Sequence, residues 1–96
     1  MIEFKIFIGL NDKHAHKQLY KNEYYINEIS KRFNNCTIQL GTGLYKQEKE
    51  NTIILNYITN DNEKQNVYNI VNHLKLLFNQ ECILVTETLL NKFELV

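Results

Sequence analysis

The chain carries no net charge, because eleven Lys and Arg residues balance eleven Asp and Glu residues among its 96 positions. A general nucleic-acid coat or a polybasic membrane binder needs an excess of positive charge, so the sequence argues against both. No apolar run approaches the ~18–20 residues that span a bilayer. The first ten residues interrupt their apolar positions with charges and lack the basic leader of a signal peptide. We therefore expect a cytoplasmic protein that contacts neither membrane nor nucleic acid.

Cysteine is equally scarce, since only Cys36 and Cys82 occur and they lie far apart. Two lone cysteines in a cytosolic chain are typical of buried thiols, with a disulfide or a metal site as the alternatives. No Cys-x-x-Cys or paired Cys/His spacing supports zinc. The sequence therefore predicts neither a metal nor a cofactor.

Proline and tryptophan are absent and glycine occurs only three times, whereas Asn, Lys and Ile make up more than a third of the chain. AT-rich codons encode these three residues, so part of the bias reflects the genome rather than the fold. Hydrophobic residues form 44% and charged residues 23% of the chain, which is close to the globular average and argues against disorder. The length fits one domain over residues 1–96.

The first half of the chain reads as strand, loop, helix and strand. Residues 2–10 alternate with a period of two, which predicts a half-buried strand. A polar loop at 11–18 leads to an amphipathic helix at 19–33, and Asn34-Asn35 are expected to end it. A second strand is expected at 36–44, with Cys36, Ile38 and Leu40 facing inward. Gly41-Thr42-Gly43 would interrupt its end as a bulge or a close backbone approach.

The second half repeats this order after a charged turn at 45–51. Residues 52–59 form a third expected strand, with Ile53, Leu55 and Tyr57 on one face. Residues 60–63 resemble a capping box, and apolar residues then recur at helical spacing up to Phe78. A fourth strand follows at 82–88, and the apolar tail at 89–96 would be a fifth strand or a docking segment. This order predicts a ferredoxin-like α+β fold, βαββαβ, with a four-stranded antiparallel sheet and two helices on one face.

Three polar segments are candidates for binding a small polar or anionic ligand. They follow the first strand, follow the glycines and precede the last strand, and the fold is expected to bring some of these loops together. Lysines would meet phosphate groups, a tyrosine could stack on a base, and amides would read polar edges. The predicted ligand-binding residues are Asn11, Asp12, Lys13, Gly43, Tyr45, Lys46 and Gln80.

No arrangement of catalytic residues is recognisable in the sequence. There is no nucleophile elbow, Ser/His/Asp set or paired-carboxylate signature. His14 and His16 could share a metal only with a third ligand, and they are expected to be solvated instead. The scattered acids Glu48, Glu50, Glu81 and Glu87 are interpreted as solvated charges rather than catalytic bases. The glycine run lacks both glycine-rich phosphate-binding patterns.

Four segments resemble a family of small uncharacterised proteins from phages, plasmids and other mobile elements of low-GC Gram-positive bacteria. These are Phe-Ile-Gly-Leu-Asn-Asp-Lys at 7–13, Gly-Leu-Tyr-Lys at 43–46, Glu-Asn-Thr at 50–52 and Leu-Phe-Asn-Gln-Glu-Cys-Ile-Leu-Val at 77–85. The resemblance covers roughly residues 4–86. It implies a role in the conflict between a mobile element and its host.

Three functions follow as hypotheses. The leading one is a non-enzymatic binding protein that counters host defence by sequestering a nucleotide-like signal. The alternative is a protein–protein inhibitor of a host defence nuclease or effector complex. A third is a small enzyme that works at Gln80 and Glu81. Because the small core leaves sheet edges and an apolar tail to be shielded, we also expect a homodimer.

Overall fold

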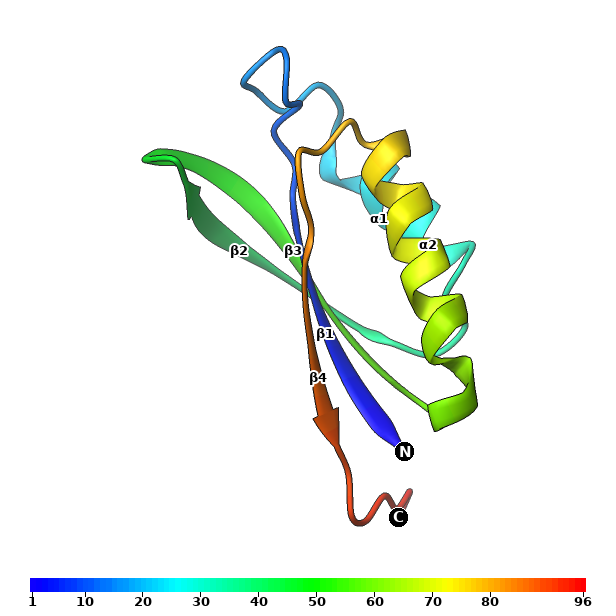
Figure 1. Cartoon of the computed structure of the whole chain (residues 1–96). Coiled ribbons are helices and arrows are strands. Elements are labelled where there is room, and N and C mark those ends of the chain that lie inside the picture. Colours follow the sequence, from blue (N-terminus) through cyan, green and yellow to red (C-terminus); the bar gives the residue numbers. More distant parts are fainter.

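Four strands form one antiparallel sheet in the order β2-β3-β1-β4, and two helices cover one of its faces (Figure 1). The computed structural model describes all 96 residues. Its elements in chain order are β1 (Ile2–Gly9), α1 (Asn22–Ser30), β2 (Thr37–Tyr45), β3 (Glu48–Thr59), η1 (Asp61–Glu63), α2 (Lys64–Leu77) and β4 (Leu84–Leu89). This is the predicted ferredoxin-like α+β arrangement. Neither helix is long and apolar enough to cross a bilayer.

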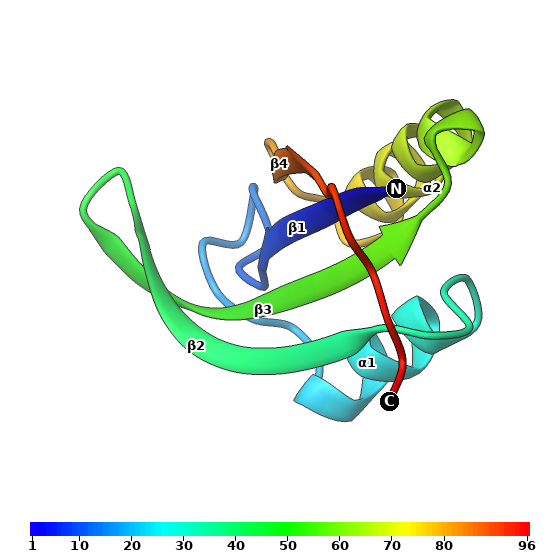
Figure 2. The ribbon, with the colours of Figure 1, turned by 90° about the horizontal axis from the view of Figure 1, so that it is seen from below.

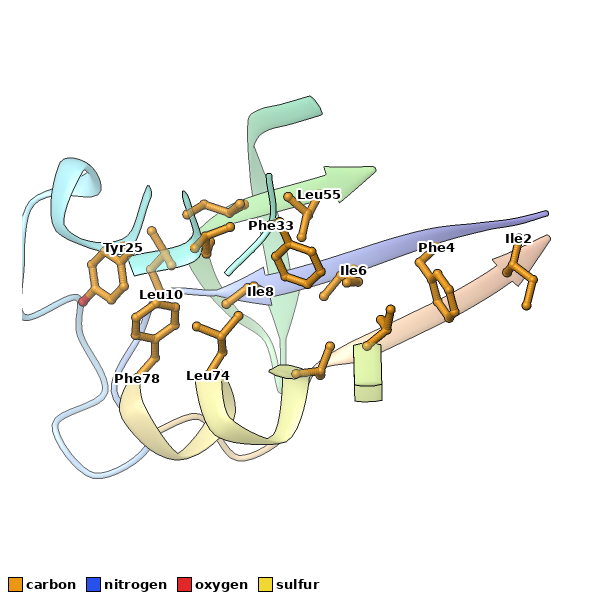
Figure 3. Close-up of a cluster of buried hydrophobic side chains, with 14 residues drawn as sticks. Ile2, Phe4, Ile6, Ile8, Leu10, Tyr25, Phe33, Leu55, Leu74 and Phe78 are labelled. Atoms are coloured by element: carbon orange, nitrogen blue, oxygen red, sulfur yellow. The ribbon is translucent and has the colours of Figure 1, made fainter. Parts of the chain in front are cut away.

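The central strand β1 supplies the middle of the core, as its alternation predicts. Its helix-facing side chains are all buried: Ile2, Phe4, Ile6, Ile8 and the following Leu10. They belong to a cluster of 14 buried residues that includes Leu74 and Phe78 from α2 and its end (Figure 3). Full burial of each large side chain contributes roughly 1.5–3 kcal/mol. The other face of β1 carries Phe7 and Gly9 and remains uncovered by helices.

Helix α1 is shorter than the period of apolar residues predicts. It begins at Asn22, so Leu19 and Tyr20 precede it and are exposed. The chain before it is held as a loop by an isolated bridge between Asn11 and Gln18. The helix ends at Ser30, and neither of the two following asparagines adopts a left-handed conformation, so the predicted Asn stop is wrong.

The β2–β3 hairpin differs most from its prediction. Lys46 and Gln47 have φ of 49° and 67°, which makes a tight two-residue turn of the type that joins twisted strands. Tyr45 therefore pairs with Glu48, and residues 48–51 are strand rather than a charged turn. Both glycines of β2 stay in regular register, so no bulge forms. Leu40, which the sequence predicts to face inward, is exposed. The tip of the hairpin extends beyond the helices (Figure 2).

Helix α2 has the predicted buried stripe but not the predicted cap. A short 3₁₀ turn at Asp61–Glu63 precedes it, and no side chain caps its first turn. Val67, Val71 and Leu74 face the sheet. Asn79 ends the segment with φ of 51°, a left-handed conformation that asparagine tolerates.

The chain ends without a fifth strand. Beyond β4 the backbone of Leu90 donates one hydrogen bond to the Met1 carbonyl at 3.0 Å, and residues 91–96 are exposed. The prediction of two buried thiols is wrong for Cys82 and only partly met by Cys36. Cys36 is half-buried, and burial raises the pKa of its thiol, whereas Cys82 is exposed. Both cysteines are free.

Candidate functional site

A cavity of about 360 Å³ opens on the helix-free face of the sheet, in the range of roughly 300–1,000 Å³ typical for small-molecule sites. Its walls come from the loop after β1, the tip of the β2–β3 hairpin and the segment before β4, which meet at one end of the sheet (Figure 1). All seven residues predicted from the sequence line this cavity: Asn11, Asp12, Lys13, Gly43, Tyr45, Lys46 and Gln80.

Asp12 shapes the loop after β1. Its Oδ1 accepts hydrogen bonds from the backbone of His14 and Ala15, both at 2.9 Å, and its Oδ2 accepts one from Asn79 Nδ2 at 2.8 Å. The Ala15 amide, the Asn79 side chain and the His14 amide together lower the pKa of Asp12. Because both carboxylate oxygens are occupied, Asp12 supports the site rather than offering a free group to a ligand.

The loop after β1 and the segment before β4 are joined directly. The backbone N–H of Lys13 donates to the Asn79 carbonyl at 3.0 Å, and Gln80 Nε2 donates to the Asn11 carbonyl at 2.7 Å. These bonds link residues almost 70 positions apart and fix one wall of the cavity. The Lys13 side chain forms no ion pair and stays exposed at the rim.

Glu50 projects from β3 onto the floor of the cavity. Its Oε2 accepts a hydrogen bond from the backbone N–H of Asn11 at 3.0 Å. A Cβ on Gly9 would overlap the Glu50 carboxylate, so Gly9 leaves the space that the carboxylate fills. Gly43 acts similarly on β2, since a Cβ there would lie 2.5 Å from Thr52 Oγ1. The two glycines therefore create the floor.

The cavity's three glutamates differ in their partners. Glu81 pairs with Lys46 at 3.0 Å, and Glu48 lies 3.7 Å from His16 Nδ1. Glu50 alone forms no ion pair and retains one free oxygen. An unpaired carboxylate on a partly enclosed wall favours a cationic or hydrogen-bond-donating ligand.

Tyr45 and Cys82 meet at the mouth of the cavity. The Cys82 thiol, with burial and the nearby Glu81, raises the pKa of Tyr45 to about 12. The Tyr45 hydroxyl is therefore protonated at neutral pH, and its neighbours are the Cys82 thiol and the Glu81 carboxylate. Lys46 lies 5.4 Å from the Tyr45 ring centroid and lowers the pKa of Glu81 by its hydrogen bonds.

Apolar surface completes the floor beside these polar groups. Phe7 of β1 pairs in register with Leu84 of β4 and with Ile54 of β3, and Phe7 and Leu84 line the cavity. A planar base or a methyl group would find apolar contact there, next to hydrogen-bonding groups at the rim.

Sequence reasoning missed the glutamates, which it interpreted as scattered solvated charges. Glu48 and Glu50 alternate with Lys49, and this pattern continues the period of β3, so both side chains point to the open face. Assigning the turn to residues 46–47 would have shown that both glutamates belong to the third strand and face the open side of the sheet. His14 and His16 are both exposed, as the sequence predicts.

Comparison with known proteins identifies the fold. No protein-family model and no curated protein matches the sequence. The structure is similar to a phage SAM lyase solved in complex with S-methyl-5'-thioadenosine, with a TM-score of 0.70 and 17% identity over 91% of this chain and 79% of that one. A de novo designed protein, Foldit4, matches at a TM-score of 0.48 and 16% identity, over 94% of this chain and 96% of that one.

This likeness overturns the prediction that the chain is not an enzyme. That prediction rested on the lack of a recognisable catalytic motif, yet the phage SAM lyase is an enzyme with the same fold. The neighbour is also a phage protein.

Proposed function

We propose that this chain binds S-adenosylmethionine in the cavity and cleaves it, releasing S-methyl-5'-thioadenosine. The observation that carries the proposal is Glu50, a carboxylate without an ion-pair partner in a ligand-sized cavity. The shared fold with a phage SAM lyase supports the choice of ligand. S-adenosylmethionine carries charged groups that the side chains of the polar cavity can match.

The substrate carries opposite charges, and the cavity offers a group for each. Glu50 would attract the sulfonium or ammonium group, because the cavity wall partly shields the charges from water. Lys13 at the rim, free of ion pairs, would meet the substrate carboxylate. Phe7 and Leu84 would contact the apolar faces of the nucleoside.

The cleavage breaks the bond between sulfur and the amino-acid chain. The electron pair of that bond stays on sulfur, which becomes a neutral thioether. The carbon fragment is completed either by attack of its own carboxylate on the carbon that sulfur leaves or by loss of a proton to a base. Glu50 is the base that the cavity offers for the second route.

Cleavage would also provide the counter-defence role that the sequence suggests. Removal of S-adenosylmethionine withholds the methyl donor from host enzymes that need it. The proposed role is therefore enzymatic removal of S-adenosylmethionine rather than sequestration of a nucleotide-like signal. An enzyme needs less protein for this, because one protein molecule can cleave many ligand molecules.

The test follows S-methyl-5'-thioadenosine release by liquid chromatography after incubation with S-adenosylmethionine. We expect release by the wild-type chain and a loss of about 100-fold or more in Glu50→Gln, which keeps the size of the side chain and removes its charge. Glu23→Gln is the matched control, because Glu23 is exposed on α1 and outside the cavity. No release by the folded wild-type chain, with no binding of either molecule at about 100 μM, rejects the proposal.

A further inference from the structure

Gln80 is the one polar residue in the buried set of the chain, with 5% of its surface exposed. Its Nε2 donates to the Asn11 carbonyl at 2.7 Å. A carbonyl oxygen can only accept, so this bond fixes which end of the Gln80 amide faces Asn11. The amide oxygen must point the other way.

That oxygen has no hydrogen-bond partner within the protein. No fully enclosed side-chain nitrogen or oxygen in the chain lacks a partner, so Gln80 Oε1 keeps an accessible side. Gln80 lines the cavity, and Oε1 is the end of its amide that is turned away from the Asn11 carbonyl. A buried residue with one amide end satisfied and the other free is an arrangement suited to ligand recognition.

The backbone around Gln80 holds this orientation in place. Its N–H donates to the Lys75 carbonyl at 2.9 Å, and the preceding Asn79 is fixed in a left-handed conformation by its bonds to the loop after β1. The amide cannot turn to offer its nitrogen without breaking the bond to Asn11. Gln80 is therefore an acceptor and not a donor toward the cavity.

We infer that Gln80 Oε1 selects a 6-aminopurine over a 6-oxopurine in this cavity, an inference that rests on the proposed function. The amino group of adenine donates to such an oxygen, whereas the carbonyl of hypoxanthine would place two acceptors face to face. This corner of the cavity therefore favours donor groups.

The experiment measures binding of S-methyl-5'-thioadenosine and S-methyl-5'-thioinosine by calorimetry. The wild-type chain is expected to prefer the adenine compound by about tenfold or more. In Gln80→Met the preference should shrink to within about twofold, because the acceptor is gone. Gln65→Met is the matched control, since Gln65 is exposed on α2 and bonds only to Asn69.

The possible outcomes distinguish a role of Gln80 in choosing between the two compounds from a role in holding the cavity wall. Equal binding of both compounds to the wild-type chain overturns the inference and leaves the proposed function standing, and this comparison needs no variant. Equal weakening of both compounds in Gln80→Met, with the preference retained, assigns Gln80 a purely structural role. The 2'-deoxy analogue of S-methyl-5'-thioadenosine is measured as a third compound. If Gln80→Met loses discrimination against this analogue rather than against the 6-oxo compound, the oxygen contacts the ribose and the inference is overturned. Absence of binding by either compound rejects the inference together with the proposed function.

Discussion

Gly9 shows how a missing side chain can build a site. It lies on the open face of β1, two residues after Phe7, where strand alternation would otherwise place another side chain. The Glu50 carboxylate occupies that space and reaches the backbone of Asn11. The charge of the cavity floor therefore depends on a residue that contributes no chemistry of its own.

Replacing Gly9 by alanine should damage the site more than the fold. The added methyl group overlaps the Glu50 carboxylate, which must leave the Asn11 N–H. We expect binding of S-methyl-5'-thioadenosine to weaken by about tenfold or more, measured by calorimetry. The thermal midpoint should fall by only a few degrees, because a flexible side chain can move aside.

Gly41→Ala provides the control for this change. A Cβ at Gly41 would lie 3.7 Å from Ile54 Cδ1, an ordinary packing distance, and β2 keeps its register there. Binding should stay within about twofold of the wild type. Equal losses in the two alanine variants would show that strand flexibility, rather than the Glu50 carboxylate, governs binding.

At the scale of the element, β4 depends on a polar contact with α2. It pairs with β1 alone and forms one edge of the sheet. Tyr68 of α2 donates a hydrogen bond to Glu87 of β4, and Lys64 pairs with the same carboxylate at 3.0 Å. The Tyr68 hydroxyl first and Lys64 second lower the pKa of Glu87. These contacts attach an edge strand that has no fully buried side chain of its own.

Tyr68→Phe should loosen β4 without disturbing the core. The variant keeps the edge-to-face contact of the ring with Phe4, whose centroid lies 6.1 Å away, and removes only the hydroxyl. We expect amide hydrogen exchange in β4 to accelerate by about three- to tenfold, with exchange in β3 unchanged.

Tyr24→Phe is the control for Tyr68→Phe, because the Tyr24 hydroxyl forms no hydrogen bond and its ring packs against Tyr20 and Tyr25. Unchanged protection of β4 in Tyr68→Phe would mean that strand pairing with β1 alone holds it.

Elements with a strong local pattern were predictable, and the hairpin was not. The period of two in β1 and the spacing of Val67, Val71 and Leu74 in α2 follow from burial of one face, so they are visible in the sequence. The two-residue turn at 46–47 uses Lys and Gln at positive φ, where Asn or Gly is the usual signal. Because Lys46 and Gln47 do not have this signal, the sequence predicts residues 48–51 as part of a turn rather than as the first four residues of β3.

For the whole molecule, the shifted carboxyl groups predict loss of stability in acid. Hydrogen bonds to Ala15, Lys31, Lys46 and Tyr68, respectively, are the largest causes that lower the pKa values of Asp12, Glu28, Glu81 and Glu87. The unfolded chain binds protons first as the pH falls, so these contributions are complete above the ordinary values of 3.8 and 4.5 and are lost below them.

Urea unfolding at pH 7, 5, 4 and 3 measures this prediction, with the midpoint expected to fall mainly between the last three values. A midpoint that stays constant down to pH 3 would contradict it. In the opposite direction, the pKa values of Tyr45 and Tyr68 are raised, so their contributions to stability should decline above pH 10.

Self-association remains a prediction from the exposed sheet edges. Leu40 and Leu44 on β2 and Leu84 and Leu89 on β4 are all more than half exposed. Sedimentation at about 100 μM should show a dimer or larger species, and Leu40→Lys should shift it toward monomer. Leu76→Lys on α2 is the control, because Leu76 is exposed but lies away from both edges. A monomeric wild-type chain would exclude this expectation.

The sequence by itself determined the order of the elements, the buried faces of β1, β3 and α2, and seven residues that line the cavity. These follow from the periods of strands and helices and from the turn chemistry of Asn and Asp, which act over a few residues. The tertiary structure alone decided that Glu50 meets Asn11 across 39 positions and that Gly9 leaves room for it. Strand register and hairpin curvature set those contacts, and a slip of one residue would turn Glu50 to the opposite face.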